Sequence, residues 1–284
     1  MRTVLICVLG VILFCGSLQS YTIDVMVDVS HSIEHVNAEN NLVVIGKLLP
    51  EFTFDYNHDQ ALTEDVLKKY DVVMMYEPHS ELDASEIEAV KTWVWEGGGL
   101  IVCGVHDIAW NEPSRNSFNR LVSTFGIQFL SNAVDDPTDK KGCYCTPVIH
   151  NLVEHPLTAE VSQIVFYKPC ALTVTGDAEP IARGDDDTKT VGIDNLEGEN
   201  IIVVAVSQYE KGKVIVMGSN SVFVDSFINQ PNNQEFSINC FQWASEQAIP
   251  KRNPWTTVSA IAVIVILLTA FIALKKRKRH AEIE

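Results

Sequence analysis

The chain has 284 residues, with 21 lysine or arginine residues against 37 aspartate or glutamate residues. Residues 21–254 alone carry 15 basic and 35 acidic side chains, a net charge of −20. Such a surface repels nucleic acid and anionic lipid, so it excludes a nucleic-acid-binding function. The negative charge favours binding of cations or basic partners. Alternatively, it is general surface acidity that serves no partner. This segment is long enough for one hydrophobic core and too short for two.

The first residues have the layout of a secretory signal peptide. Arg2 supplies a positive charge, an unbroken apolar run extends from Val4 to Cys15, and the small residues of GSLQS (16–20) follow. The apolar run is too short to span a bilayer, and cleavage after Ser17 or Ser20 is expected. We therefore assign residues 1–20 to a signal peptide and expect the folded domain at residues 21–250.

Strands and helices alternate through the first half of this domain. Continuous apolar or β-branched runs predict strands at residues 21–28, 51–58, 71–76 and 100–104. Apolar residues at helical spacing predict helices at residues 38–51, 62–70, 83–96 and within 115–130. The helix at 83–96 starts with a capping box, Asp83 with Glu86, and Gly97 ends it. This alternation is typical of a doubly wound parallel sheet in an α/β protein.

The second half is rich in strands. Strands are predicted at residues 170–174, 179–184, 189–194 and 200–219, with hairpin turns at Gly184–Asp187 and Glu210–Lys213. An amphipathic helix over residues 232–247, with Phe236, Cys240 and Trp243 facing inward, is expected to close the domain.

The end of the chain predicts a membrane anchor. After a short linker (251–254), residues 255–274 contain no charge, and at about 1.5 Å per residue they cover the roughly 30 Å hydrocarbon core of a bilayer. Five consecutive cations, Lys275 to Arg279, begin a basic tail (275–284) and place it in the cytoplasm. The sequence thus predicts a single-pass type I protein of the cell membrane or an endomembrane, with its folded domain outside.

The segment YDVVMMYEP, followed by LDASEIEAVKTWVWEGGGLIVCG and NSFNRLVSTFGIQF, resembles the glutamine-amidotransferase-like domain called GIFT. VDVSH after the first strand, EHPLT at residues 154–158 and the late stretch GKVIVMGSNSVFVDSF are also similar. An intraflagellar-transport subunit, a subunit of oligosaccharyltransferase and many secreted archaeal and bacterial proteins share this domain. The resemblance implies a flavodoxin-like, class I amidotransferase-like fold and covers nearly the whole folded domain.

Cys103 stands where the class I amidotransferases carry their nucleophile. A thiol attacks as a thiolate and needs a base within hydrogen-bond reach. The resemblance places the catalytic histidine and glutamate after the late strand, where this chain has SNSVFVD, and no histidine occurs between His155 and His280. We therefore expect a non-catalytic protein without a cofactor, with Cys103 as the fallback nucleophile.

Polar residues follow several of the predicted parallel strands, whose carboxyl ends share one edge of the sheet. Together with Cys103, the candidate ligand-binding residues are Asp28, Ser30, His31, Glu77, His79, His106, Asp107, Ser219 and Asp225. Ligands bind at this edge in open α/β sheets, and these side chains could hold a divalent metal or the hydroxyl groups of a sugar. Ordinary capping and turn chemistry is the alternative interpretation.

Five cysteines follow the predicted signal peptide. We expect a disulfide from Cys143 or Cys145 to Cys170, as suits an oxidising exterior. A zinc site made by CYC with His150 and His155 is a poorer match, because structural zinc sites favour two to four residues between paired cysteines. The acidic runs DDPTDKK and GDDDTK lack the spacing of a calcium loop and are interpreted as solvated turns.

Two functional hypotheses remain. The first is a non-catalytic, membrane-tethered extracellular domain that binds a glycan or a partner protein, as an accessory subunit of a glycosylation or surface complex. The second is a hydrolase or amidotransferase that uses Cys103 or a metal at the carboxyl edge of the sheet. The missing late histidine favours the first.

Overall fold

The computed structural model describes residues 22–32, 38–106 and 109–247. The predicted signal peptide (1–20), linker (251–254), membrane span (255–274) and basic tail (275–284) lie outside these residues. Among the described residues, no helix is both long and apolar enough to cross a bilayer.

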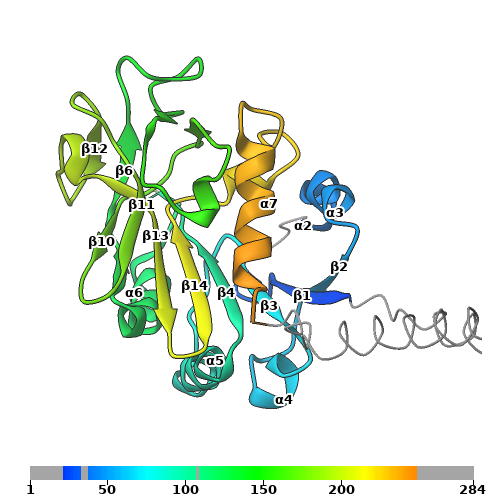
Figure 1. Ribbon diagram of the computed structural model, residues 1–284. Coiled ribbons are helices and arrows are strands. Elements are labelled where there is room, and N and C mark those ends of the chain that lie inside the picture. The colour runs from blue at the N-terminus through cyan, green and yellow to red at the C-terminus, as the bar shows by residue number, and fades with distance from the viewer. Residues whose placement is uncertain (1–21, 33–37, 107–108, 248–284) are drawn as a thin grey trace, which may run out of the picture. The chain divides into compact units, whose positions relative to one another are not determined.

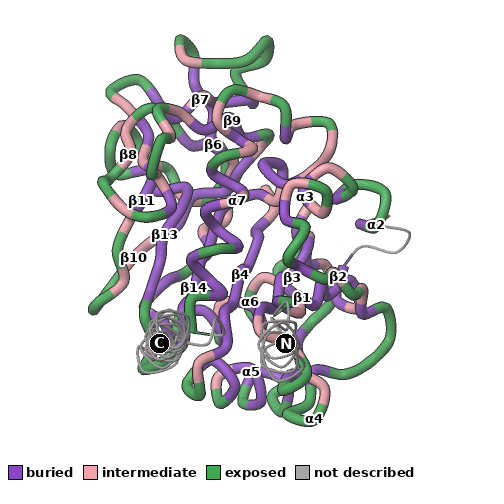
Figure 2. Tube along the Cα trace, turned by 45° about the vertical axis from the view of Figure 1, so that its right-hand side comes forward, coloured by how far each residue is buried: buried purple, intermediate pink, exposed green. Residues whose placement is uncertain are grey.

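Five parallel strands form the first half of the main sheet, in the order β2-β1-β3-β4-β14. They are β1 (Ile23–Asp28), β2 (Phe52–Asn57), β3 (Val72–Met75), β4 (Gly99–Cys103) and β14 (Gly212–Met217). Every residue of β3, β4 and β14 is buried, as their continuous apolar sequences predict for strands covered on both faces. Figure 2 shows these strands as buried tube in the middle of the domain.

Antiparallel strands extend the sheet beyond β14, so the ten-stranded sheet is mixed rather than parallel throughout. The strands are β13 (Ile202–Tyr209), β10 (Leu172–Val174), β5 (Ile127–Phe129), β11 (Glu179–Arg183) and β8 (Asn151–Leu152). The β13–β14 hairpin, with its turn at Glu210 and Lys211, confirms the predicted turn at Glu210–Lys213.

Two short antiparallel pairs lie apart from the main sheet. One joins β12 (Lys189–Gly192) to β6 (Asn132–Asp135), and the other joins β7 (Val148–Ile149) to β9 (Ile164–Val165). The predicted hairpin turn at Gly184–Asp187 is therefore wrong. The strands on either side of it find other partners, because β11 pairs with β13 and β8 while β12 pairs with β6.

Helices cover both faces of the sheet, as expected for a doubly wound fold (Figure 1). One face carries α2 (Ala38–Asn41), α3 (Val43–Leu48) and α7 (Asn233–Ala244), and the other carries α4 (Glu64–Leu67), α5 (Ala84–Glu96) and α6 (Glu112–Val122). Short 3-10 helices occur at Ser123–Phe125, Pro156–Thr158, Gly198–Asn200 and Ser221–Phe223.

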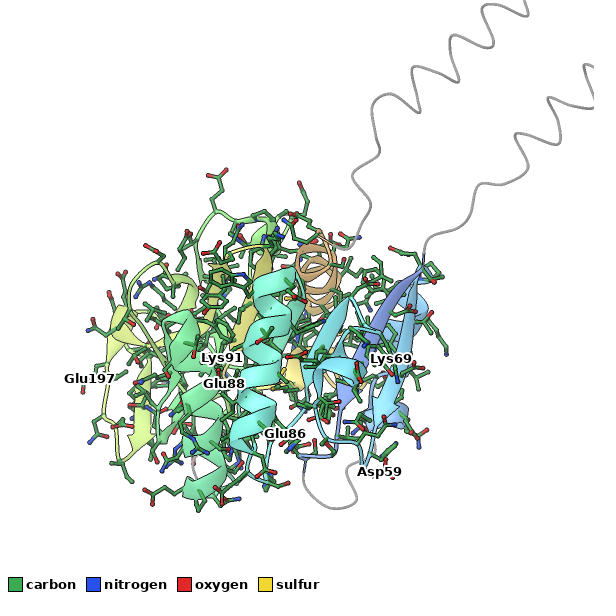
Figure 3. All side chains as sticks on the ribbon, turned by 90° about the horizontal axis from the view of Figure 1, so that it is seen from below. Asp59, Lys69, Glu86, Glu88, Lys91 and Glu197 are labelled. Carbon is green, nitrogen blue, oxygen red and sulfur yellow. A yellow bond between two sulfur atoms is a disulfide. The ribbon has the colours of Figure 1, made fainter. Side chains whose placement is uncertain are left out.

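The helix α5 forms as its sequence predicts. Asp83 and Glu86 complete the capping box, and Gly97 ends the helix with a φ of 125°. Glu88 and Lys91 lie side by side on its outer face (Figure 3), where their charged atoms are 2.8 Å apart. The inward-facing apolar residues of the helix are buried against the sheet.

The helix α7 packs directly on β4. A Cβ atom on Gly99 would lie only 2.2 Å from the carbonyl oxygen of Ala244, so the helix and the strand meet without an intervening side chain. Phe236, Cys240 and Trp243 are buried, as the amphipathic pattern predicted.

Candidate functional site

The corner after β1 is a closed network of polar side chains. Asp28 is 1% exposed, and its Oδ1 accepts hydrogen bonds from the Ser30 hydroxyl (2.6 Å) and from the Asn57 amide (2.9 Å). Asn57 ends β2, beside Asp28 in the parallel register. These polar groups are therefore already partnered inside the protein.

His31 lies between two buried carboxylates. Its Nδ1 is 2.8 Å from Asp28 Oδ2, and its Nε2 is 3.2 Å from Glu86 Oε2. Burial alone would lower the pKa of His31, but the hydrogen bond and charge of Asp28, together with those of Glu86, outweigh it and raise the pKa above its ordinary value. The raised pKa favours the charged imidazole, which ties the corner after β1 to the first turn of α5.

Ser30, His31 and Asp28 do not form a nucleophilic triad. The Ser30 hydroxyl lies 3.1 Å from Nδ1 of His31, the same ring nitrogen that faces Asp28. A triad needs the serine and the carboxylate on opposite ring nitrogens, so that the base can accept the serine proton while the carboxylate orients it. The opposite nitrogen of His31 faces Glu86 instead.

Glu77 occupies the corner after β3 in a left-handed backbone conformation, with a φ of 51°. This conformation is uncommon for a residue that carries a Cβ, and in this chain Glu160, Lys168, Glu210 and Asn232 adopt it as well. Burial raises the pKa of the half-buried Glu77 carboxyl, and the charge of His79 partly offsets this rise. The corner thus holds a carboxylate in a partly desolvated position.

Backbone hydrogen bonds join the polar corners at the carboxyl edge of the sheet. The carbonyl oxygen of His31 accepts from the amides of His79 (2.6 Å) and Ser80 (3.0 Å). The side chain of Asn111, the N-cap of α6, donates to the carbonyl oxygen of His79. The structure therefore brings the corners after β1 and β3 together with the segment that follows β4, as the parallel topology predicted.

Cys103 is wholly buried at the end of β4. Burial, and secondly the negative charge of Glu77, raise the pKa of its thiol above the ordinary range. Both effects oppose formation of a thiolate, and the nearby carboxylate is the opposite of the cationic surroundings that activate a cysteine.

The remaining predicted site residues differ in their surroundings. His106 follows β4 and is partly exposed, while Asp107 lies outside the described residues. The hydroxyl of Ser219 donates to the carbonyl oxygen of Tyr167 (2.9 Å). Asp225 accepts from the backbone amide of Val44 (2.9 Å) and so holds the start of α3. Ser219 and Asp225 thus have structural partners within the protein.

The cysteine pairing differs from the prediction. The disulfide joins Cys143 to Cys145, so the predicted link from either residue to Cys170 is wrong. Cys170 is buried beside the carboxyl ends of the central strands, where its Sγ lies 3.5 Å from the carbonyl oxygen of Gly218. Cys143, by contrast, is on the surface, in the loop between β6 and β7.

Two acidic runs that are distant in sequence meet in the structure. Carboxylate oxygens of Asp136, Asp185 and Asp187 lie within 4.8 Å of one another, a set that could hold a hard divalent cation. Asp136 is buried and accepts from the hydroxyl of Thr188 (2.9 Å), while Thr138 donates to Asp187 (3.0 Å). Sequence reasoning treated each run as a separate turn and missed this contact.

Glu86 and Asn57 are the partners that sequence reasoning did not assign to the site. Glu86 was expected only to cap α5, yet its second oxygen also accepts from the backbone amide of Leu62 (2.9 Å). The signal available in the sequence was the position of Asn57 at the end of a strand, beside the acidic corner.

One family model matches this chain. It is the model of ThuA, described as trehalose utilisation, and it matches residues 25–244. A protein of Aquifex aeolicus (strain VF5), itself described as uncharacterized, is 24% identical over 190 residues, which cover 64% of this chain and 78% of that protein.

Solved structures share the fold at low sequence identity. The mmIFT52 N-terminal domain has a TM-score of 0.64 at 18% identity, and the match covers 78% of this chain and 97% of that domain. A cytoplasmic protein of Salmonella typhimurium has a TM-score of 0.54 at 16% identity, with 78% and 98% covered. A thuA-like protein of Bacteroides uniformis has 0.52 at 17% identity, with 78% and 91% covered. These likenesses are consistent with the expected amidotransferase-like fold.

Proposed function

Since the chain belongs to the ThuA family, we propose that it is a non-catalytic domain that binds a sugar at the carboxyl edge of its sheet. Glu77 and His79 are the residues proposed to contact the ligand. The network around Asp28 and His31 holds the corner beside them.

The burial of the Cys103 thiol is the observation that carries this proposal. The alternative enzyme would use Cys103 or a metal at the same edge, and its cysteine route needs a reactive thiolate at the end of β4. Here the thiol is fully buried, and both desolvation and Glu77 favour its neutral form. With the nucleophile inactive, binding is the function that the arrangement supports best.

The chemistry of the corner supports a polyhydroxyl ligand. A carboxylate accepts hydrogen bonds from adjacent hydroxyl groups, and the ring N–H of an imidazole can donate one to a hydroxyl oxygen. Partial burial of Glu77 strengthens such hydrogen bonds, because water competes less for the carboxylate. The family description, trehalose utilisation, favours a sugar over a peptide as this ligand.

We further propose that residues 255–274 tether the domain to a membrane as a type I protein, with glycans or the subunits of a membrane complex as its partners. The uncharged run and the five cations that follow it support this proposal. Co-purification in mild detergent tests it: recovery of membrane glycosyltransferase subunits supports the complex, and recovery of this chain alone counts against it.

Sugar binding is tested by substitution of Glu77. Trehalose and a panel of mono- and disaccharides would be titrated by calorimetry into the wild-type protein and into Glu77→Gln. The amide keeps the size of the side chain but loses its charge, so we expect about tenfold weaker binding, as for the loss of a hydrogen bond to a charged group. Glu88→Gln, on the outer face of α5, is the matched control and should bind like the wild type. Equal affinity of the Glu77 and Glu88 variants would reject the site.

The alternative enzyme is tested by the reactivity of Cys103. A buried neutral thiol should react slowly with iodoacetamide in the native protein and rapidly after unfolding. Cys103→Ser should cost about 1–3 kcal/mol of stability, because a hydroxyl enters an apolar site, and should leave sugar binding unchanged. Rapid native alkylation with an apparent pKa below that of a free thiol would instead indicate a catalytic cysteine.

A further inference from the structure

We propose that the Cys143–Cys145 disulfide is a thiol–disulfide exchange site that takes two electrons from the dithiol of a partner polypeptide. The proposal concerns the loop between β6 and β7 and is independent of the sugar site.

The bond is exposed and contributes little to folding. Cys143 is on the surface, and Tyr144, the residue between the two cysteines, is 60% exposed. A disulfide stabilises a fold chiefly by restricting the unfolded chain, and this effect grows with the number of residues in the closed loop. A loop that encloses one residue gains the least, so stability does not account for the bond. Exposed disulfides are the ones that exchange readily.

The loop holds both cysteines in place without the disulfide. The amide of Thr146 donates to the carbonyl oxygen of Cys143 (2.9 Å), which closes a turn around the pair. The amide of Asp136 donates to the carbonyl oxygen of Tyr144 (2.8 Å), and the amide of Lys168 donates to the carbonyl oxygen of Cys145 (2.8 Å). Because these backbone bonds do not involve sulfur, the pair can open and close while the loop keeps its conformation.

The surroundings favour a thiolate on Cys143. Its Sγ accepts a hydrogen bond from the amide of Cys145 (3.3 Å), and a donor of this kind stabilises a thiolate once the pair is reduced. Among the carboxylates of the same loop, Asp136 is buried and accepts from the amides of Thr138 and Asp139, so its charge is already partnered. Asp139, partly buried, lies 4.0 Å from His150.

The exchange proceeds in two balanced steps. A thiolate of the partner attacks the exposed Sγ of Cys143, a partner–Cys143 disulfide forms, and the Cys143–Cys145 bond breaks with its electron pair on Cys145, which takes up a proton. The second thiolate of the partner then attacks the partner's own sulfur and releases Cys143 as a thiolate. The partner's dithiol is oxidised to a disulfide, and the Cys143–Cys145 pair is reduced to a thiol on Cys145 and a thiolate on Cys143.

Exposed aromatic rings beside the bond suit a polypeptide better than a small thiol. Tyr167 is 44% exposed and precedes Lys168, whose amide binds Cys145. Its ring packs against Phe227 with centroids 5.6 Å apart, which fixes its position. Tyr144 and Tyr167 together offer an amphipathic surface of the kind enriched at protein interfaces.

The test starts with reduction of the native full-length protein in detergent. Millimolar reduced glutathione should open the Cys143–Cys145 bond, as counted by alkylation and mass spectrometry, without a change in melting temperature. In Cys145→Ser, the Cys143 thiolate should attack oxidised glutathione, forming a mixed disulfide and releasing one reduced glutathione, about tenfold faster than Cys145 does in Cys143→Ser. Resistance of the bond until the domain unfolds, unfolding on reduction, or equal capture by the two variants would overturn the proposal.

A second arm separates a polypeptide dithiol from a small thiol. Reduced thioredoxin should reduce the wild-type bond faster than Tyr144→Ala, while both proteins react equally with glutathione. Equal rates for the two proteins with thioredoxin would overturn the assignment of a polypeptide partner.

Discussion

At the scale of single residues, the buried ionisable groups around His31 form one interdependent set. Asp28 and Glu86 are both buried and face opposite nitrogens of one imidazole. A buried charge persists only when it is paired, so each member of this set requires the others. The backbone hydrogen bond from the amide of His79 to the carbonyl oxygen of His31 links this set to the corner that holds Glu77.

Loss of the imidazole should therefore lower the stability of the folded domain. His31→Ala leaves two buried carboxylates without their cation and should lower the free energy of unfolding by about 3–5 kcal/mol, measured by urea denaturation at pH 6. His58→Ala is the matched control, because His58 pairs with Glu39 at 2.8 Å while its side chain is 59% exposed, and it should cost less than about 1 kcal/mol. Similar losses in the two variants would contradict this account.

The same cluster predicts a pH dependence. The pKa of His31 is raised in the folded state, so its contribution is fully present below the unfolded value of about 6.5 and is lost as pH rises through the folded pKa. The difference in unfolding free energy between the wild type and His31→Gln should shrink as pH rises above neutrality. A difference that stays constant up to pH 10 would show that the imidazole is not held in its charged form.

At the scale of elements, the contact between α7 and β4 depends on a glycine. Gly99→Ala would place a Cβ 2.2 Å from the carbonyl oxygen of Ala244, which belongs to backbone and cannot rotate away. We expect a loss of about 1–3 kcal/mol, as for overpacking of a core.

Gly46, within α3, is the matched control for Gly99. The nearest atom to its added Cβ is 4.0 Å away, on Phe54. Gly46→Ala should raise stability by about 0.4–1 kcal/mol, because alanine restricts the unfolded chain and favours helix. Thermal unfolding of both variants measures the change in stability. A change of the same sign in the two variants would show that the close contact between Gly99 and α7 does not determine the cost of an added Cβ.

At the scale of the whole molecule, the parallel half of the sheet gathers residues from distant segments at one edge, while β13, β10 and β5 enlarge the sheet on the other side of β14.

The predicted span after residue 254 would fix this domain outside the cell. Protease added to intact cells should then remove the acidic domain and leave a small fragment with the KKRKR tail. Cleavage of the tail with protection of the domain would show the opposite orientation.

Several features followed from the sequence because their causes are local. The α5 capping box, the apolar runs of β3, β4 and β14, and the β13–β14 turn depend on residues that are close in the chain. The carboxyl edge of the parallel strands was predictable because polar residues follow strands whose direction the alternating pattern specifies.

The tertiary structure alone decided which distant groups meet. The sequence by itself determined the acidic α/β domain, its strand–helix alternation and the weak case for Cys103 as a nucleophile. It did not predict that Glu86 would pair with His31, that Asp136 would meet Asp187, or that β12 would pair with β6. Nor did it reveal that Cys170 would be buried while Cys143 pairs with Cys145. Such pairings depend on how separate segments pack against one another, and the order of residues along the chain does not specify the spatial distance between two distant residues.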